Sequence, residues 1–556
     1  MARRHRTSGH RTGGQRAASA VLALALGLGV GVAAQPAVAA PAFVPAVPAV
    51  PAVPAVPAVP AVPAVPAVPA GASAFGGFRL ADITARDGVV LKADVFTPPA
   101  GAPGADARGR YPVVVQPASW GQNDLEYVAQ GHKFAAAGYV VVTYTVRGFW
   151  RSGGEVDVAG PKDVADISTV IDWALAHTQA DPDRVGMIGL SLGGGLTLLG
   201  AAFDRRIKAV ASLSGWADLT DALYSGQTRH TSAADRLATI EGLTGRKSPE
   251  FATALDDLFA DHDLPAVVKW ADVRSPATYL DRINANGAAV YLANGWSDSF
   301  FNPGQMTDFY QRLTVPKRLE LRPGDHASQE FTGLLGFSDA TWDNARGWLD
   351  RYLKGSPGAN DQAQGVDLEV RPGGAHEAYP DWRSVASRTE RLSFGDSSTV
   401  RGDQPSGASG GVVLLSGLVD QWLHQPPTVL VPLLDRDAAA VRQSEPYRRG
   451  LSVRGAARVH TTVTSSAPQG TGVAYLYDVD ALGVGRLIAH APQSWSGRPV
   501  GQPFPLDVTL FPTAYDLPAG HRLALVLGTH DDLYGGETPK GSTVTFGPAE
   551  VALPVR

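Results

Sequence analysis

The amino-acid sequence predicts an α/β fold, a doubly wound sheet with a helical cap insertion, followed by an all-β sandwich or jelly-roll domain. Three observations support this prediction. Strand-like and helix-like segments alternate between residues 75 and 385, as they do in mostly parallel sheets. Residues 216–285 interrupt the alternation with helical sequence of mixed polarity, and beyond residue 390 the helical period disappears.

Composition limits the kind of protein this is. The 556 residues include 48 Lys and Arg against 53 Asp and Glu, a net charge of −5. A chain of this length normally forms two or three domains. The 44% apolar content excludes a wholly disordered protein, and the acidic balance argues against a nucleic-acid partner. Because the chain has no cysteine, disulfides, thiol nucleophiles and zinc ribbons are excluded.

Residues 1–39 have the pattern of a secretory signal peptide. The first 16 residues hold five arginines and no acid, residues 17–34 are apolar, and Ala37-Val38-Ala39 fits an A-x-A cleavage site. We therefore expect a secreted, extracellular protein, cleaved near Ala39 and without a membrane segment afterwards. An uncleaved membrane anchor is the alternative, and Arg3-Arg4 leaves both the general and the twin-arginine export routes open.

Residues 40–72 are predicted to be a linker. Within them the triplet Val-Pro-Ala repeats nine times, from Val44 to Ala70. Prolines at every third position line one edge of a polyproline II helix, so the repeat would extend about 80 Å if fully ordered. It could hold the protein away from a membrane or associate with the cell wall. Alternatively, its length has no selected role.

Residues 73–387 are predicted to form the α/β domain, with the cap at 216–285. A tight turn at Asp87-Gly88 joins the first two strands. In such sheets ligands bind beyond the carboxyl ends of the strands. The expected strands are residues 80–86, 89–96, 112–116, 139–146, 185–189, 209–213, 288–293 and 318–322, with helices that include 192–202.

Residues 388–556 are predicted to form the all-β domain. Short segments, many of them alternating, are separated there by Gly, Pro, Asp and Ser turns, which favours a sandwich or jelly roll. The expected strands are residues 412–415, 428–434, 458–464, 473–479, 487–490, 506–510, 522–527 and 542–546.

The strongest chemical signal is the G-x-S-x-G motif of residues 189–193, with Ser191 at its centre. The motif lies between a predicted strand and a predicted helix, where a serine in a strained turn is presented as a nucleophile. A tight turn whose serine only caps the helix is the alternative. The context favours a nucleophile.

A serine needs a base, and the base needs an orienting carboxylate. Asp298 and His326 each follow a predicted strand, in the chain order serine, acid, histidine. We therefore predict a triad of Ser191, Asp298 and His326. Asp325 is the rival acid, but adjacent residues rarely orient each other as a triad requires; its other role is that of a turn carboxylate.

Stabilising the negative oxygen of the transition state requires hydrogen-bond donors. The backbone N–H of Leu192, the residue after the nucleophile, is the first. The second is expected from the loop of residues 117–121, which contains Trp120. The triad needs no cofactor and no metal.

Several motifs together resemble the X-Pro dipeptidyl-peptidase and cocaine esterase family. They are residues 146–154 (VRGFWRSGG), the serine motif, 295–298 (GWSD), 348–355 (WLDRYLKG) and the C-terminal segment 511–523. The resemblance covers residues 75–556. It implies an α/β-hydrolase domain with a helical cap, a jelly-roll domain that walls one side of the site, and the same three triad residues.

One position departs from the family pattern. Members usually place a tyrosine, whose hydroxyl serves the oxyanion hole, where this chain has Trp120. Either Trp120 contributes its side-chain or backbone N–H, or another donor is used. Since amides need more oxyanion stabilisation than esters, the change puts efficient amide cleavage in doubt.

The function predicted first is therefore a secreted serine hydrolase that releases Xaa-Pro dipeptides from small peptides. Hydrolysis of carboxylic esters, as in cocaine esterase, is the alternative; a non-catalytic surface-binding protein is a possibility of another class. An aminopeptidase must hold an ammonium group. The cap acids that could do so, or form a solvated helix face, are Glu241, Glu250, Asp256, Asp257, Asp261 and Asp263. The aromatic residues that could line an acyl pocket, or hold the cap to the body, are Trp216, Tyr224, Phe251, Phe259 and Trp270.

Overall fold

A computed structural model describes residues 76–355 and 364–556, and these described residues belong to one compact unit. The predicted signal peptide (1–39) and linker (40–72) lie outside the described residues. Among the described helices, none is long and apolar enough to cross a membrane.

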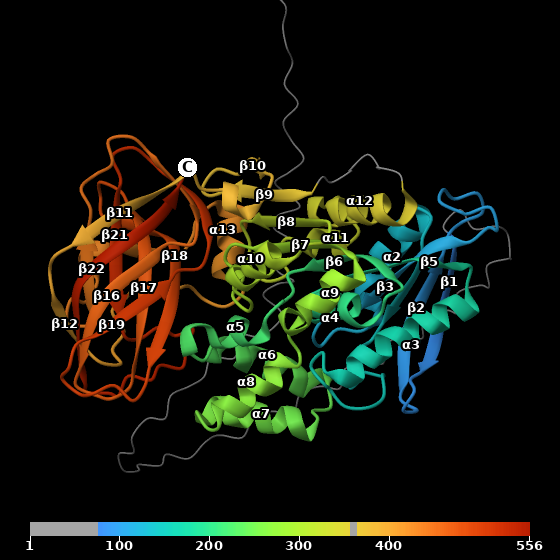
Figure 1. Cartoon of the computed structure of the whole chain (residues 1–556), viewed down its shortest axis with the longest axis horizontal. Helices are drawn as coiled ribbons and strands as arrows, with labels where there is room; N and C mark the ends of the chain where they lie inside the picture. Colours follow the sequence, from blue (N-terminus) through green and yellow to red (C-terminus); the bar gives the residue numbers. More distant parts are fainter. Residues whose placement is uncertain (1–75, 356–363) are drawn as a thin grey trace, which may run out of the picture. The chain divides into compact units, whose positions relative to one another are not determined.

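The N-terminal half contains a ten-stranded sheet (Figure 1), in the order β1-β2-β4-β3-β5-β6-β7-β8-β9-β10. The seven strands from β4 to β9 in this order pair in parallel, and both edges are antiparallel. The predicted doubly wound sheet is confirmed. Its strands are β1 Gly77–Thr84, β2 Val90–Thr97, β3 Tyr111–Pro117, β4 Val140–Tyr144, β5 Ala180–Leu190, β6 Ile207–Leu213, β7 Ala289–Gly295, β8 Lys317–Arg322, β9 Gly365–Val370 and β10 Ala375–Tyr379.

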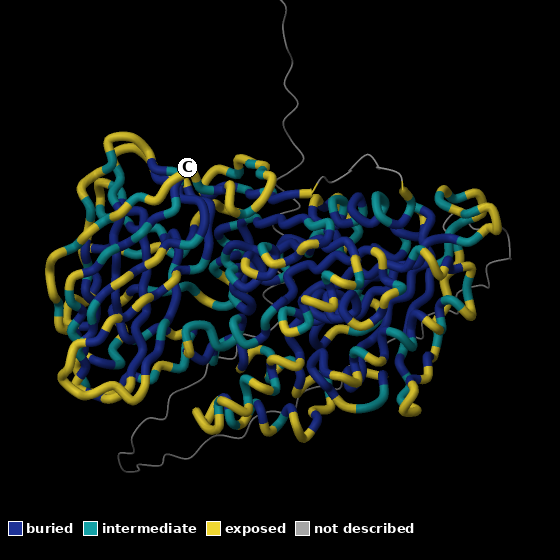
Figure 2. The backbone as a smooth tube through the Cα atoms, in the orientation of Figure 1, coloured by how far each residue is buried: buried dark blue, intermediate teal, exposed yellow. Residues whose placement is uncertain are grey.

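Helices cover both faces of this sheet, which is why its central strands are continuous apolar runs buried along their length (Figure 2). Val113 and Val115 of β3 pack in one core with α3 and α4, whereas Val114 packs in another with α2 and α12. The helices and short turns are η1 Asp124–Tyr127, α2 Val128–Ala136, α3 Pro161–His177, α4 Leu192–Phe203, η3 Pro276–Tyr279, α9 Leu280–Asn286, α10 Pro303–Arg312, α11 Phe331–Leu334 and α12 Ala340–Lys354.

A helical cap lies between β6 and β7, as predicted. Helix α7 begins with Pro249 in its first turn, and the Ser248 side chain accepts a hydrogen bond from the Phe251 N–H. The cap elements are α5 Leu219–Tyr224, η2 Ser225–Gln227, α6 Thr231–Thr244, α7 Pro249–Ala260 and α8 Leu264–Asp272.

The C-terminal part is a sandwich of two antiparallel sheets, as predicted. One has the order β19-β16-β22-β15-β20, with β11 and β12 also paired to β22; the other has the order β13-β18-β17-β21-β14. The two inner faces share one apolar core. The strands are β11 Arg388–Phe394, β12 Ser398–Arg401, β13 Thr428–Leu430, β14 Ala439–Gln443, β15 Leu451–Gly455, β16 Arg458–Ser465, β17 Gly470–Val479, β18 Val484–Trp495, β19 Phe504–Thr509, β20 Thr513–Leu517, β21 Arg522–Gly528 and β22 Thr543–Val555.

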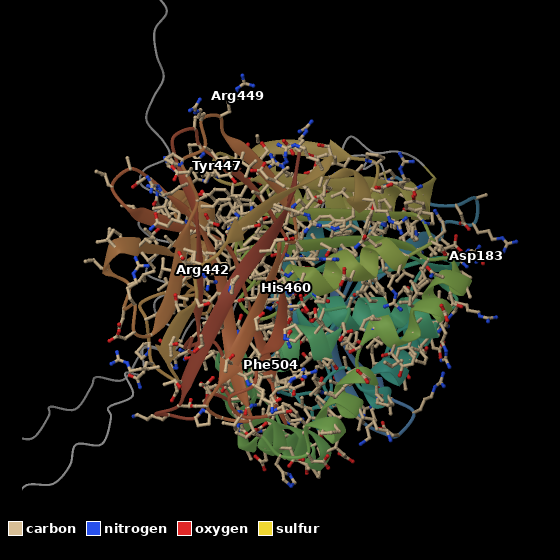
Figure 3. All side chains as sticks on the ribbon, turned by 60° about the vertical axis from the view of Figure 1, so that its left-hand side comes forward. Asp183, Arg442, Tyr447, Arg449, His460 and Phe504 are labelled. Atoms are coloured by element: carbon tan, nitrogen blue, oxygen red, sulfur yellow. The ribbon has the colours of Figure 1, made fainter. Side chains whose placement is uncertain are left out.

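Alternation along the strands separates the inner and outer faces of the sandwich. Phe504 on β19 is buried against Trp495, whereas His460 on the neighbouring β16 is exposed and pairs with Asp507 (Figure 3). Residues 412–415, which we predicted as a strand, instead form a turn before helix α13 (Ser416–Leu423). The strand prediction was wrong because it assumed that an apolar run is buried; here Leu414 has a left-handed φ of 64° and is exposed. The predicted strand 428–434 is a strand only at its start, and the short helix η5 follows at Val431–Leu433.

Candidate active site

Ser191 lies in the sharp turn between β5 and α4, with a left-handed φ of 56°. The two glycines around it are required by close backbone contacts. A Cβ on Gly189 would lie 2.4 Å from the Gly193 carbonyl carbon, and a Cβ on Gly193 would lie 2.3 Å from the Pro117 oxygen. The structure thus explains why the serine motif needs glycine at both positions.

The three residues predicted as a triad meet at the carboxyl edge of the sheet. Ser191 Oγ is 2.8 Å from His326 Nε2, and His326 Nδ1 is 3.0 Å from Asp298 Oδ2. All three residues are buried. Burial alone would lower the pKa of His326, but the charge of Asp298 and its hydrogen bond raise that pKa above its ordinary value. This geometry suits a base that accepts the serine proton.

Asp298 is fixed by its own loop. Its Oδ1 accepts hydrogen bonds from the N–H groups of Phe300 and Phe301, at 3.0 and 2.8 Å. The rings of these two phenylalanines lie against the His326 imidazole, with centroids 4.8 and 5.0 Å away. Phe300 and Phe301 could not be predicted as site residues, because nothing in the local sequence pattern separates them from ordinary core residues.

Among the described residues, the Asp325 carboxylate forms hydrogen bonds with Ser299, Gly417 and the backbone of His326, and none with the His326 imidazole. Its Oδ1 accepts from the backbone N–H of His326 at 2.8 Å and from the Ser299 hydroxyl at 2.6 Å. Burial raises its pKa to about 6. Asp325 therefore shapes the turn that carries His326.

A second buried acid supports the same loop. Ser214 Oγ donates to Glu330 Oε1 at 3.0 Å and accepts from the Ala327 N–H at 3.3 Å. Burial raises the pKa of Glu330 to about 8, so its carboxyl is protonated at neutral pH. Ala327 has a left-handed φ of 60°, and this hydrogen bond helps to hold it. No sequence signal marked Ser214 or Glu330.

The loop of residues 117–121 is tied to the end of β5. The Tyr127 hydroxyl accepts from the Leu190 N–H at 3.0 Å, and Ser119 Oγ donates to the Leu190 carbonyl at 2.9 Å. Trp120, next in that loop, lines the cavity beside Ser191. Tyr127 was not identified from the sequence.

The indole N–H of Trp120 already has a partner. It donates to the Leu237 carbonyl of cap helix α6 at 2.8 Å, and its ring packs edge-on against Phe149 and Phe251. The indole therefore links this loop to the cap, and we predict that it does not donate to the oxyanion. The backbone N–H groups of Leu192 and Trp120 remain the predicted donors.

An apolar cavity opens beside Ser191 beneath the cap. Four of the five aromatic residues that we expected in an acyl pocket line it, and Phe259 does not. Among the described residues that line it there is no Asp, Glu, Lys, Arg or His. The lining includes Trp120, Ser191, Trp216, Leu223, Tyr224, Leu237, Phe251, Ala254, Leu255, Leu258, Trp270 and Phe301.

None of the six cap acids lines this cavity. Glu241 is buried but forms an ion pair with Lys247 at 3.2 Å, and Asp257 pairs with His262 at 2.7 Å. The other four, Glu250, Asp256, Asp261 and Asp263, are exposed. These four acids therefore belong to a solvated face of the cap helices and not to a substrate site.

Comparison with family models finds two matches. Residues 87–328 match the model of the X-Pro dipeptidyl-peptidase (S15 family). Residues 357–552 match the model of the X-Pro dipeptidyl-peptidase C-terminal non-catalytic domain.

Among known proteins, one from Streptomyces avermitilis named "Putative Xaa-Pro dipeptidyl-peptidase" is 23% identical over 488 residues, 74% of this chain and 70% of that protein. An uncharacterised 31.7 kDa protein of Escherichia coli is 36% identical over 115 residues, 20% of this chain; the match spans only 40% of that relative.

Two solved structures share the fold over most of both chains. An aminopeptidase from a Thaumarchaeota archaeon has a TM-score of 0.65 at 16% identity, covering 89% of this chain and 99% of that one. An α-amino acid ester hydrolase has a TM-score of 0.65 at 17% identity, covering 88% and 98%.

Proposed function

This chain belongs to the X-Pro dipeptidyl-peptidase (S15) family of serine hydrolases, and we propose that it hydrolyses carboxylic esters whose acyl group is uncharged and apolar. The reaction would proceed through an acyl-enzyme on Ser191. The cavity beside Ser191 carries this proposal, because its described lining is apolar and contains no carboxylate. Family membership leaves no support for a non-catalytic binding protein.

The cavity's chemistry supports an uncharged acyl group. Burying an ammonium ion without an opposite charge costs several kcal/mol, so a site for amino-terminal substrates needs a nearby acid. An alkyl or aryl acyl chain, in contrast, gains free energy as it leaves water, about 25 cal/mol per Å² of apolar surface. The walls supplied by Phe251, Leu255 and Leu258 suit such a chain.

In the proposed mechanism His326 Nε2 accepts the Ser191 proton as Oγ attacks the ester carbonyl. Asp298 stabilises the imidazolium that forms, and His326 then gives the proton to the leaving alcohol. A water molecule, activated by the same histidine, releases the acid and restores the serine. The negative oxygen would be stabilised by the backbone N–H groups of Leu192 and Trp120.

The tethered indole of Trp120 also favours esters over amides. With its N–H bonded to Leu237, this side chain adds no donor to the two amides. Each donor contributes roughly 10²–10³ in rate. A site with fewer donors is better matched to alkoxide leaving groups than to amines.

Release of Xaa-Pro dipeptides is the second candidate. The family name favours it, and a prolyl ring is apolar enough for the cavity. It would require an acid to bind the substrate's amino terminus, and the described lining offers none.

We also propose that the protein is secreted, on the evidence of the signal-peptide pattern in residues 1–39. The Val-Pro-Ala repeat would then serve as a spacer, free or associated with the cell wall. Mass spectrometry of the N-terminus of protein from the culture medium tests this: an end at Ala40 supports secretion, and an intact leader on cell-bound protein contradicts it.

The enzymatic proposal is tested with paired substrates. We expect the purified protein to hydrolyse p-nitrophenyl butyrate, with turnover abolished in Ser191→Ala. On alanyl-prolyl p-nitroanilide its kcat/KM should be at least about 100-fold lower, because the ammonium group is left unpaired.

If the anilide is hydrolysed as efficiently as the ester, and this turnover also depends on Ser191, the protein is a dipeptidyl-peptidase and the ester proposal is wrong. Turnover of the ester that persists in Ser191→Ala would refute the acyl-enzyme.

A further inference from the structure

Two consecutive residues in the loop before helix α3 have a left-handed backbone. The φ angles of Val158 and Ala159 are 54° and 56°. This region is uncommon for residues other than glycine, and it is least favourable for a β-branched residue such as valine. Strained residues persist only where the surrounding structure holds them, and they cluster at ligand sites. The strain at Val158 therefore points to a function for its side chain.

A buried arginine holds this strained loop. Arg274, which follows cap helix α8, donates from Nε to the Asp157 carbonyl at 3.0 Å and from Nη2 to Asp157 Oδ1 at 3.2 Å. The Gly160 N–H donates to the same carbonyl at 3.1 Å, and the Lys162 N–H donates to Asp157 Oδ2 at 3.0 Å. Asp157, directly before Val158, is therefore fixed through both its carbonyl and its carboxylate.

The same arginine also positions two aromatic walls of the cavity beside Ser191. Its guanidinium lies over the Trp270 ring, 3.9 Å from the centroid, and its Nη1 donates to the Trp270 carbonyl at 3.0 Å. Its own carbonyl accepts a hydrogen bond from the Trp216 indole N–H at 3.0 Å. Trp216, Trp270 and Val158 all line the cavity. Arg274 therefore fixes the strained loop and the cavity wall as one unit.

The two strained residues differ in their relation to the cavity. Among the described residues, Val158 lines it and Ala159 does not. Both are buried, with exposed fractions of 8% and 0%, and Ala159 packs in the core of the α/β domain. The strained backbone therefore places Val158, and not its neighbour, against a bound acyl group.

The cavity is small enough for one side chain to change what it holds. Its volume is about 90 Å³. An apolar cavity of about 150 Å³ in a protein is large enough for benzene. A group that fills the cavity beside Ser191 is therefore smaller than a benzene ring, and a short alkyl chain meets this limit. The isopropyl group of Val158 is itself comparable in size to such a chain, so the cavity would be much larger without it.

We propose that Val158 is a specificity-determining residue that restricts the cavity to short acyl groups, no larger than butyryl. This rests on the proposed function, since it refines which esters are hydrolysed. A longer acyl chain would meet the isopropyl group before its carbonyl carbon reached Ser191 Oγ. The strained φ would be tolerated because it places a branched side chain at this point of the wall.

Substitutions of Val158 in both directions test this proposal. V158A and V158G shorten the side chain, and V158L lengthens it. The ratio of kcat/KM for p-nitrophenyl octanoate to that for p-nitrophenyl butyrate should rise at least about tenfold in V158G and by less in V158A, because a single methylene in an apolar pocket changes specificity by about 10–200-fold. V158L should instead favour p-nitrophenyl acetate over the butyrate. A residue with only a structural role would lower the rates on all three esters together.

Ala159 provides the matched control. A159G relaxes the same left-handed backbone at the next position, and Ala159 does not line the cavity. The octanoate-to-butyrate ratio of A159G should therefore equal that of the wild type. Circular dichroism and melting temperature show which variants are folded; if V158G is not folded, V158A and V158L carry the test.

Alkyl boronic acids probe the cavity without an ester. The Ser191 oxygen adds to boron as its proton passes to His326, no group leaves, and the alkyl group occupies the acyl site. Isothermal titration calorimetry should give the wild type a lower Kd for propylboronic acid than for heptylboronic acid. V158G should raise the relative affinity for heptylboronic acid at least about tenfold, and A159G should not change it.

The outcomes separate this proposal from the proposed function. A shift in boronic-acid preference in V158G, without ester turnover by any folded variant, supports the role of Val158 and refutes the ester hydrolase. Ester turnover with the same chain-length preference in V158G, V158L and the wild type overturns the role of Val158 and leaves the ester hydrolase in place. A wild type that prefers heptylboronic acid also overturns that role. So does a shift in A159G as large as that in V158G, because the loop backbone and not the Val158 side chain would then set the preference.

Discussion

Trp120 shows how one side chain can exchange one role for another. Its indole N–H donates to the Leu237 carbonyl, so the residue links the oxyanion loop to the cap. Trp120→Phe should leave that carbonyl without its donor and cost about 1–3 kcal/mol of stability. We expect kcat/KM on p-nitrophenyl butyrate to fall less than about tenfold, because the proposed oxyanion donors are backbone amides.

A loss of kcat/KM much larger than tenfold in Trp120→Phe would contradict the role of Trp120 as a cap tether. If the indole itself donates to the oxyanion, Trp120→Phe should lower kcat by roughly 10²–10³ with little change in KM. Measuring both constants and the melting temperature on one preparation distinguishes a cap tether from a catalytic donor.

His326 determines the pH dependence. A base must be unprotonated to accept the Ser191 proton, so kcat/KM should rise as pH increases through the pKa of His326. Burial alone would lower that pKa, but Asp298 raises it above the ordinary 6.5, so the acid limb should lie above 6.5. In Asp298→Asn the raising charge is gone: the limb should move to lower pH, and the plateau should drop by about 10³-fold or more.

The same profile can contradict the assignment. An acid limb that stays in place in Asp298→Asn would mean that another group sets it. Glu330 is a candidate, with a pKa raised to about 8 by burial, and its Gln variant would then remove the limb.

At this scale the sequence was informative about residues that follow strand ends. Ser191, Asp298 and His326 each come directly after a predicted strand, and topology brings such positions to one edge. Ser214 and Glu330 could not be predicted in this way. They meet through a side-chain hydrogen bond across 116 positions, and no periodicity encodes that.

Among the elements, α13 is the one whose packing against the catalytic loops can be tested most directly. A Cβ on Gly417 would lie 2.7 Å from the Asp325 Cβ. Gly417→Ala should therefore push the helix away from the loop of His326. Because a displacement of about 1 Å at a triad can cost 10²-fold, we expect a clear loss of kcat/KM and a lower melting temperature.

Gly395 provides the matched control for this substitution. It follows strand β11, and a Cβ there meets no atom within 4 Å. Gly395→Ala should change neither kcat/KM nor the melting temperature. Equal effects of the two substitutions would contradict the role given to the α13 contact.

Prediction of elements succeeded where apolar residues are buried. Strands β3, β4 and β6 were found because continuous apolar runs imply a strand covered on both faces. Residues 412–415 carry the same apolar signal but face solvent, so they were assigned to a strand that does not exist, and α13 was missed. Its polar residues pair inside, which inverts the pattern that identifies an amphipathic helix.

At the scale of the whole molecule, an ion pair joins the large sheet to the sandwich. Glu377 on β10 accepts from the buried Arg454 of β15 at 2.8 and 3.0 Å. The hydrogen bond from Arg454 lowers the pKa of Glu377 to about 2, against an ordinary 4.5. A carboxyl whose pKa is depressed on folding stabilises the fold above its unfolded pKa and loses that contribution as pH falls through its folded pKa.

We therefore expect part of the acid destabilisation to fall between pH 4.5 and about 2. Urea unfolding across this range should show a shallower pH dependence in Glu377→Gln than in the wild type. If the free energy of unfolding has the same pH dependence in both proteins, the Glu377–Arg454 ion pair makes no measurable contribution to stability.

Two ester substrates that differ in one ammonium group show whether the site accepts only uncharged apolar acyl groups. We would measure kcat/KM for ethyl butyrate and ethyl 2-aminobutyrate by pH-stat, each against Ser191→Ala. We expect kcat/KM for ethyl butyrate to be higher by at least about 100-fold, because the ammonium group of the other ester would be buried without an opposite charge. Equal or better turnover of the amino ester would contradict it and imply an ammonium site that the apolar cavity does not provide.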